Sequence, residues 1–268
     1  MYNRHIRFII LHYTNLPFEE SLDILRHTGV SAHFLVPKEP KVPVVKIVEM
    51  HERAHHAGVS AWQSTTNLND CSVGIEIVNY GFGFVQENQI LYYHHVHGHD
   101  HPRHDQFMNI DPCTLYALEK TGKISWDPYP DHQIDILISL LKEITENINI
   151  LPVAITGHAD IAPNRKQDPG PKFPWKKLAA AGIGAWPDDE AVSKIHTLRK
   201  NKKIDIAWLQ NALKTYGYRI DVTNTLDQQT KEVLVAFQMH FRPENYSGHP
   251  DTETCSILEA LLQKHYKS

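Results

Sequence analysis

The chain has 268 residues, and its 41% of hydrophobic and 22% of charged residues are ordinary for globular proteins, which excludes wholesale disorder. Its 27 basic and 31 acidic side chains give a formal net charge of -4, so we expect no polycationic surface and no nucleic-acid partner. The 19 histidines are unusually many and hint at a metal site, because histidine is the commonest metal ligand.

The first two thirds of the chain predict strands that alternate with helices. Short apolar runs indicate buried strands, and we expect them over residues 6–11, 31–36, 44–49, 72–78 and 151–156. Apolar residues at helical spacing indicate helices over residues 18–27 and 130–148. This mixture with a buried sheet is typical of an α/β or an α+β domain.

Residues 86 to about 124, which lie between a strand and the long helix, contain an unusual run of histidines. Six of them fall within eleven positions, with two aspartates interleaved: His94, His95, His97, His99, His101, His104, Asp100 and Asp105. We interpret this segment as an inserted loop. Three interpretations stay open: a disordered loop, a lid or partner surface near a substrate groove, or a second, weaker metal site of His97, His99, His101 and Asp105.

The last third of the chain predicts a loop, a linker and a small helical unit. Prolines and glycines interrupt residues 163–175 and 182–194, which we interpret as the loop and the linker. Apolar periodicity then predicts helices over residues 204–216, 230–241 and 252–266. Three short helices in roughly 70 residues make a small all-α module whose core is marginal in size but sufficient for folding.

The cysteines and the N-terminus bear on the compartment. Cys71, Cys113 and Cys255 are odd in number and too widely spaced for a disulfide framework. The apolar run at residues 8–11 is four residues long, whereas a secretory signal needs ~7–15 apolar residues and a membrane span ~20. We therefore expect no membrane span and a cytoplasmic location, with the cell envelope or export by a non-Sec route as the alternative.

Two histidines stand at the ends of expected strands, where open sheets place ligand-binding groups. His12 ends the first strand, His158 follows the last one, and Asp168 comes ten residues after His158 in a loop. Two imidazoles and one carboxylate form the ligand set of a catalytic zinc site, which keeps a fourth position open for water. Because a single histidine at a strand end is just as often structural, the three residues carry this prediction jointly.

Two further charged residues extend this set. Glu76 lies in the middle of an expected strand among apolar neighbours, a setting that tunes a carboxylate for general acid or base work. Lys166, two residues before Asp168, can bring a positive charge to a developing oxyanion. Taken alone, Glu76 would also fit an ion-pair partner, and Lys166 would also fit a surface lysine.

Five separated motifs occur in the order of a known enzyme family, at residues 10–14, 30–36, 56–62, 72–79 and 157–171. Through these motifs the chain resembles the zinc-dependent N-acetylmuramoyl-L-alanine amidases of the amidase-2 type, the AmpD/AmiD group. The resemblance covers residues 6 to about 178. It implies an α/β fold with a central mixed β-sheet flanked by helices, and Zn²⁺ as the cofactor.

The C-terminal unit resembles a peptidoglycan-binding three-helix module. The matching patterns lie within residues 209–218, 226–238 and 251–258, and the stretch His-Phe-Arg-Pro at 240–243 is also typical of this combination. The resemblance implies a zinc amidase catalytic domain over residues 1–190 and a peptidoglycan-binding module over residues 195–268. The alternative is a helical bundle that only packs on the catalytic domain.

The resemblance also implies catalytic roles for matching residues. The implied zinc ligands are His12, His158 and Asp168. The implied general base for the attacking water is Glu76, and Lys166 would stabilise the tetrahedral oxyanion. The implied reaction is hydrolysis of the amide between the lactyl group of N-acetylmuramic acid, or its 1,6-anhydro form, and the L-Ala of the stem peptide. The expected partners are therefore peptidoglycan or muropeptides.

The resemblance places three more residues in the substrate groove, namely His56, Trp62 and Asn79. His33 also falls in a family motif, but a core position bonded within the fold explains it better. Two alternative functions stay open, a non-catalytic peptidoglycan-recognition protein and a peptidase that cuts within the stem peptide. The first shares the fold but lacks a zinc ligand, and here the implied ligands are all present.

Overall fold

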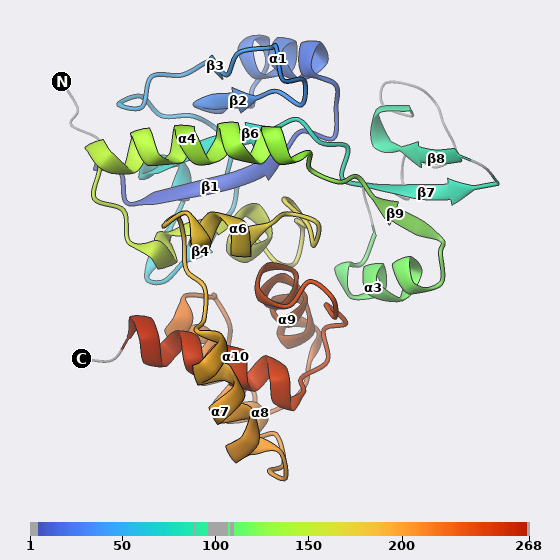
Figure 1. Cartoon of the computed structure of the whole chain (residues 1–268), viewed down its shortest axis with the longest axis vertical. Coiled ribbons are helices and arrows are strands. Elements are labelled where there is room, and N and C mark those ends of the chain that lie inside the picture. Colours follow the sequence, from blue (N-terminus) through green and yellow to red (C-terminus); the bar gives the residue numbers. More distant parts are fainter. Residues whose placement is uncertain (1–4, 88, 96–106, 108–109, 267–268) are drawn as a thin grey trace.

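The computed structural model describes residues 5–87, 89–95, 107 and 110–266. A five-stranded mixed sheet lies in the upper half of Figure 1, in the order β10-β1-β6-β2-β3. Its strands are Ile155–Gly157 (β10), Phe8–Tyr13 (β1), Ser72–Ile77 (β6), Phe34–Val36 (β2) and Val45–Lys46 (β3). The first four strands are parallel and β3 is antiparallel to β2, which confirms the α/β fold with a central mixed sheet.

Both faces of the sheet are covered, as the nearly continuous apolar sequences of β1 and β6 require. Helix α4 (Asp131–Asn147) covers one face with an apolar stripe that includes Leu137 and Leu141, both fully buried. Helix α1 (Phe18–His27) packs on the outer strands of the sheet, with Leu25 against Leu35. The short helices α5 (His158–Ile161) and α6 (Trp175–Ala180) follow β10. The expected helices 18–27 and 130–148 are therefore confirmed.

Three strand predictions need correction. The first half of the strand expected over residues 151–156 is a 3-10 turn, η3 (Pro152–Ala154), and β10 begins only at Ile155. Pro152 is the first residue of η3, and proline suits the start of a helical turn because its missing backbone N–H is not needed there. The strands expected over residues 31–36 and 44–49 shorten to β2 and β3. Two other short elements, β4 (Ala61–Trp62) and β5 (Thr65–Thr66), form a hairpin that precedes η1 (Leu68–Asp70).

The segment that we predicted as an inserted loop is largely regular where the structure describes it. Strands β7 (Phe82–Gln86), β8 (Gln89–Tyr92) and β9 (Ile124–Trp126) form an antiparallel sheet, joined by η2 (Tyr93–His95) and α3 (Pro112–Lys120). This subdomain lies beside the end of β1 in Figure 1 and has an aromatic core that includes Phe82 and Trp126. His97, His99, His101, His104, Asp100 and Asp105 lie outside the described residues.

The C-terminal helices are α7 (Asp189–Arg199), α8 (Ile206–Tyr216), α9 (Gln228–Phe241) and α10 (Thr252–His265). The last three confirm the expected helices, and each begins after an aspartate whose side chain accepts a backbone N–H of the first turn. Helix α7 corrects the predicted linker 182–194, because Ile195 is buried and α7 packs against α10. None of the described helices has the length and hydropathy of a membrane span.

The sheet and the C-terminal helices share one hydrophobic core. Phe8 and Ile10 of β1 belong to the same buried cluster as Leu213 and Phe237 of the helices. Trp62 lies between them, with its ring 5.9 Å from that of Tyr216. Since the cluster is continuous, the C-terminal helices pack directly against the sheet.

Leu137→Ala tests the packing of α4 on the sheet. Leu137 is fully buried, so its truncation leaves a cavity and should lower the free energy of unfolding by about 2–5 kcal/mol. Leu198→Ala is the matched control, because Leu198 also lies in a helix but is 63% exposed, and it should change stability by less than about 0.5 kcal/mol. Denaturant unfolding measures both, and equal losses would contradict this packing.

Candidate active site

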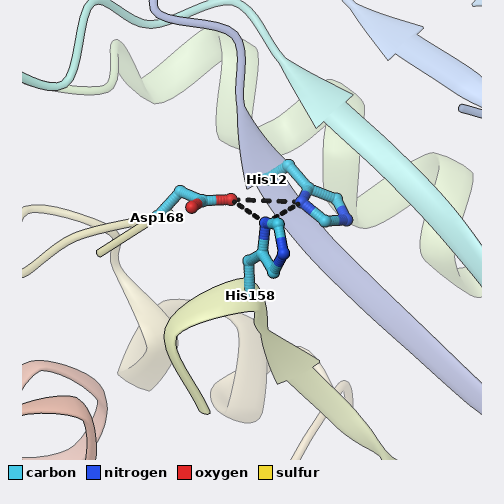
Figure 2. Close-up of side chains that lie close together, drawn as sticks. All are labelled: His12, His158 and Asp168. Carbon is cyan, nitrogen blue, oxygen red and sulfur yellow. Dashed lines mark hydrogen bonds and ion pairs between the residues drawn. The ribbon is translucent and has the colours of Figure 1, made fainter. Parts of the chain in front are cut away.

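Three elements bring the predicted ligands together. His12 lies near the carboxyl end of β1, His158 begins α5 directly after β10, and Asp168 lies in the loop that follows α5. Because β10 and β1 are adjacent and parallel, their carboxyl ends meet at one edge of the sheet. Figure 2 shows the three side chains pointing at one another.

The three ligand atoms lie within hydrogen-bond distance of one another and are buried. Nδ1 of His12 is 2.9 Å from Nδ1 of His158 and 3.1 Å from Oδ2 of Asp168, and the third distance is 3.0 Å. In the part of the chain that the structure describes, this is the one group of three such atoms compact enough to hold a metal ion. All three predicted ligands are therefore placed together.

The hydrogen bond made by Nε2 of His12, the ring nitrogen on the outer side of the site, shows which tautomer the ring adopts. This nitrogen lies 3.0 Å from Nδ1 of His56, whose other nitrogen lies 3.2 Å from the Ser72 hydroxyl, and that hydroxyl donates to the Leu68 carbonyl at 2.6 Å. Since the hydroxyl proton is used on Leu68, His56 donates to Ser72 and His12 donates to His56. His12 is then protonated on Nε2, and its Nδ1 presents a lone pair to the centre.

His56 therefore lies behind His12 and accepts its Nε2 proton in a hydrogen bond. The sequence predicted a place for His56 in the substrate groove but not this contact with a metal ligand. The His56 ring fits only because residue 74 is glycine: a Cβ on Gly74 would lie 2.3 Å from Cγ of His56. His33 is fully buried nearby, accepts the Gly74 N–H at 2.9 Å and approaches the Glu52 carbonyl at 3.2 Å. The core position expected for His33 is confirmed.

His158 has the same arrangement as His12. Its Nε2 lies 3.3 Å from the Ala57 carbonyl, which can only accept, and 3.4 Å from an Arg165 nitrogen that gives its two protons to the carbonyls of Ala57 and Val59. Nε2 of His158 therefore carries the proton, and Nδ1 also presents a lone pair. Burial lowers the pKa of His158 to about 4, which keeps the ring neutral, the form that binds metals. Burial alone would raise the pKa of Asp168, but the two histidines outweigh it and hold that pKa well below its usual range.

Three electron-pair donors thus converge on one point with no proton between them. Such an arrangement repels itself unless a cation occupies the centre, and two imidazoles with one carboxylate suit a divalent transition metal. Arg165 closes the site from outside, donating to the carbonyls of Ala57 and Val59 at 2.6 and 2.7 Å. Sequence reasoning missed Arg165, although it stands in the same motif as Lys166 and Asp168.

Glu76 stands beside this centre, as predicted from its place in the strand. It pairs with His12 across β1 and β6, so both side chains leave the same face of the sheet. Its Oε2 is buried and has no hydrogen-bond partner among the described residues. Burial raises the pKa of Glu76 to about 7, with the Asp168 charge adding to this effect and His12 and Lys166 opposing it.

Lys166 is half-buried in the loop between α5 and Asp168. Its positive charge lowers the pKa values of both Glu76 and His158, which places it within electrostatic reach of the centre. Sequence reasoning did not identify Tyr129, whose hydroxyl donates to the Pro169 carbonyl at 2.9 Å. Burial raises the pKa of Tyr129 well above its usual range, so this hydroxyl keeps its proton.

Two residues predicted to line the substrate groove lie in the interior instead. Trp62 is 1% exposed, donates its indole N–H to the Val153 carbonyl and packs against Tyr218. Asn79 is also 1% exposed, and its amide is used by the Asp127 carbonyl and the Gly81 N–H. Buried side chains with occupied polar groups cannot contact a substrate, so both predictions are wrong.

The comparisons with known proteins agree with this geometry. The amidase-2 family model, described as N-acetylmuramoyl-L-alanine amidase, matches residues 2–171, and a peptidoglycan binding domain model matches residues 203–258. The N-acetylmuramoyl-L-alanine amidase AmiD of Escherichia coli is 38% identical over 266 residues, which span 97% of this chain and 83% of AmiD. The 1,6-anhydro-N-acetylmuramyl-L-alanine amidase AmpD of Enterobacter cloacae is 30% identical over 156 residues, 58% of this chain and 59% of AmpD.

Two solved structures are similar over nearly the whole chain. AmpDh3 of Pseudomonas aeruginosa has a TM-score of 0.79 and 36% identity, with 99% of this chain and 94% of that chain covered. E. coli AmiD in complex with the substrate anhydro-N-acetylmuramic acid-L-Ala-D-gamma-Glu-L-Lys also has a TM-score of 0.79 and 36% identity, with 98% and 91% covered. The likeness therefore includes the C-terminal helices.

Metal titration tests the proposed ligand set. Asp168→Asn removes the negative ligand and leaves the shape, so the protein should bind one metal ion fewer than the native chain, or bind it at least about 100-fold more weakly. His27→Ala is the control, because His27 is an exposed histidine that contacts Asp23 and is not one of the three ligands. Elemental analysis after dialysis measures the difference, which is independent of any ions that other histidines hold. Equal metal content in both variants would contradict the site.

Proposed function

The chain belongs to the amidase-2 family of N-acetylmuramoyl-L-alanine amidases, and on that premise we propose that it cleaves muropeptides with a zinc ion held by His12, His158 and Asp168. The bond cleaved is the amide between the lactyl group of the muramic acid and the L-Ala of the stem peptide. One observation carries the proposal: three lone pairs converge beside the carboxylate of Glu76, whose buried Oε2 has no partner among the described residues.

Zinc fits this donor set in the type and number of its ligands. The Nδ1 atoms of His12 and His158 and one oxygen of Asp168 are the three protein ligands of a catalytic zinc site, which leaves a position open. A bound zinc ion supplies Lewis acidity, which polarises the scissile carbonyl and lowers the pKa of water. The residues around it supply orientation and proton transfer.

Glu76 is the group that handles the proton. Its pKa of about 7 lets the carboxylate accept a proton from the attacking water and deliver one to the departing amine. Its Oε2 has no hydrogen bond to break within the described protein, so this oxygen is available to the reaction. Lys166 lies in the loop beside Asp168. From there its ammonium group stabilises the negative charge that develops on the oxygen of the scissile carbonyl.

The substrate class is inferred from the relatives. E. coli AmiD was solved with an anhydro-N-acetylmuramic acid peptide and AmpDh3 with an anhydromuramic pentapeptide. We propose the same class for this chain, N-acetylmuramic acid or its 1,6-anhydro form linked to a stem peptide, in peptidoglycan turnover or recycling. The C-terminal unit matches a peptidoglycan binding domain, so binding to polymeric peptidoglycan is part of the proposal.

Glu76→Gln separates proton transfer from metal binding. The amide keeps the size of the side chain but cannot accept the proton, so turnover should fall by about 10²–10⁴-fold. Metal content should equal that of the native protein, because Glu76 is not one of the three ligands. Turnover of a soluble anhydro-muropeptide and elemental analysis measure the two properties, and a fully active variant would contradict the role of Glu76.

Mass analysis of digested muropeptides tests the bond that is cleaved. Release of an intact peptide that begins with L-Ala is the expected product, together with the free muramic acid carboxylate. Fragments cut within the stem peptide would instead identify a peptidase. Running the digestion in parallel on intact sacculi and on soluble anhydro-muropeptide shows which form is preferred.

A further inference from the structure

A buried carboxylate next to the metal ligands is held by the C-terminal helices. Asp160 lies two residues after His158 on α5 and is 2% exposed. Its Oδ2 accepts the Gly157 N–H at 2.8 Å and the ring N–H of His240 at 2.8 Å, and its Oδ1 accepts the Tyr218 hydroxyl at 2.5 Å. Two of its three donors therefore come from the C-terminal unit.

Both donors are themselves held rigidly. Tyr218, which follows α8, is 1% exposed and packs against the Trp62 ring at 4.9 Å. The imidazole of His240 on α9 is stacked on Trp175 at 3.8 Å and on Phe241 at 3.9 Å. Neither group can leave Asp160 without disturbing the shared core, so the position of Asp160 is set by the C-terminal unit.

The helix that carries His158 needs such support. Helix α5 has 4 residues, a single turn, and a turn of this length is not stable by itself. The Ala159 N–H donates to the Asp168 carbonyl at 2.8 Å, so the backbone of Asp168 is bonded to the same turn. A shift of α5 would therefore move both His158 and Asp168 relative to His12 on β1.

We propose that Tyr218 and His240 are positioning residues for the metal site, which act through Asp160 to fix His158 and Asp168. The C-terminal unit is then part of the framework of the active site as well as a candidate wall-binding module. The inference rests on the metal site and the amidase reaction proposed above. Mutation of residues that orient metal ligands from outside typically lowers metal affinity or activity by about 10–100-fold.

Tyr218→Phe is the central variant, because it removes one hydroxyl donor and keeps the ring. Tyr246→Phe is its matched control. The Tyr246 hydroxyl is equally buried in the contact between the C-terminal unit and the rest of the protein, where it donates to Glu119 at 2.6 Å and accepts from Trp126 at 2.9 Å. These partners belong to α3 and β9 and not to α5.

A second pair of variants examines the imidazole. His240→Phe keeps an aromatic ring between Trp175 and Phe241 but loses the donor, whereas His240→Asn keeps an N–H near the position of Nδ1. If the hydrogen bond to Asp160 is what matters, the asparagine variant should recover part of the loss. If only stacking matters, the phenylalanine variant should be the better of the two.

Four measurements on the full chain test the proposal. Tyr218→Phe and His240→Phe should raise the zinc dissociation constant, measured by chelator competition, by about 10-fold or more. Hydrogen exchange of the α5 amides in the metal-free protein should become faster. The kcat on soluble anhydro-muropeptide should fall by a similar factor, while binding to isolated sacculi stays at the native level. Tyr246→Phe should lower the Tm and leave zinc affinity, α5 exchange, kcat and sacculus binding unchanged.

The outcomes separate this inference from the proposed function. Unchanged zinc affinity and unchanged α5 exchange in Tyr218→Phe and His240→Phe would overturn the positioning role, and so would equal zinc losses in Tyr218→Phe and Tyr246→Phe. A native protein that binds zinc but cleaves no muropeptide would refute the proposed function alone. In that case weaker zinc binding in Tyr218→Phe would still support the coupling.

Discussion

The constraint on which the rest of the structure depends is the repulsion among three buried electron-pair donors. Two imidazole nitrogens and one carboxylate oxygen lie within 3.1 Å of one another, and no proton stands between them. Without a cation this arrangement is unfavourable, so the fold must hold each ligand in place from outside. Each ligand accordingly comes from a different element and has its own support: His56 for His12, the Ala57 carbonyl for His158 and α5 for Asp168.

The pairing of strands in the sheet determines which residues of β6 lie beside the ligand on β1. Because β1 and β6 pair in parallel with His12 opposite Glu76, one register brings a ligand and a proton acceptor to the same face. The residue two positions earlier on β6 is Gly74, and its missing side chain makes the room that the His56 ring occupies. Ser72, two positions earlier again, passes the hydrogen-bond chain from His12 and His56 on to the Leu68 carbonyl. Alternate residues of one strand thus serve the reaction, the packing and the tautomer of the ligand.

The parts of the site that could be predicted are those with a local signal. Apolar strands and the polar residues at their carboxyl ends pointed to His12 and His158, with Asp168 in the adjoining loop, and an acid within an apolar strand pointed to Glu76. The family resemblance then assigned their roles. Trp62 and Asn79 could not be assigned in this way, since their burial depends on Tyr218 and Asp127, which are distant in sequence. The sequence did not predict helix α7, because its apolar pattern is weak and the helix becomes buried only through its contact with α10. Family motifs locate residues but do not say which way each side chain faces.

Asp160 shows why the catalytic sheet and the C-terminal helices act as one structure. A carboxyl group that is 2% exposed is costly to bury unless hydrogen bonds replace its water, and here two of its three donors come from the C-terminal unit. Removing those helices would return Asp160 to water and would also expose the apolar surface around Trp62. Water forms hydrogen bonds of many geometries, whereas Tyr218 and His240 allow one. The helices therefore give α5 a single position, and a compact group of mutually repelling ligands requires that.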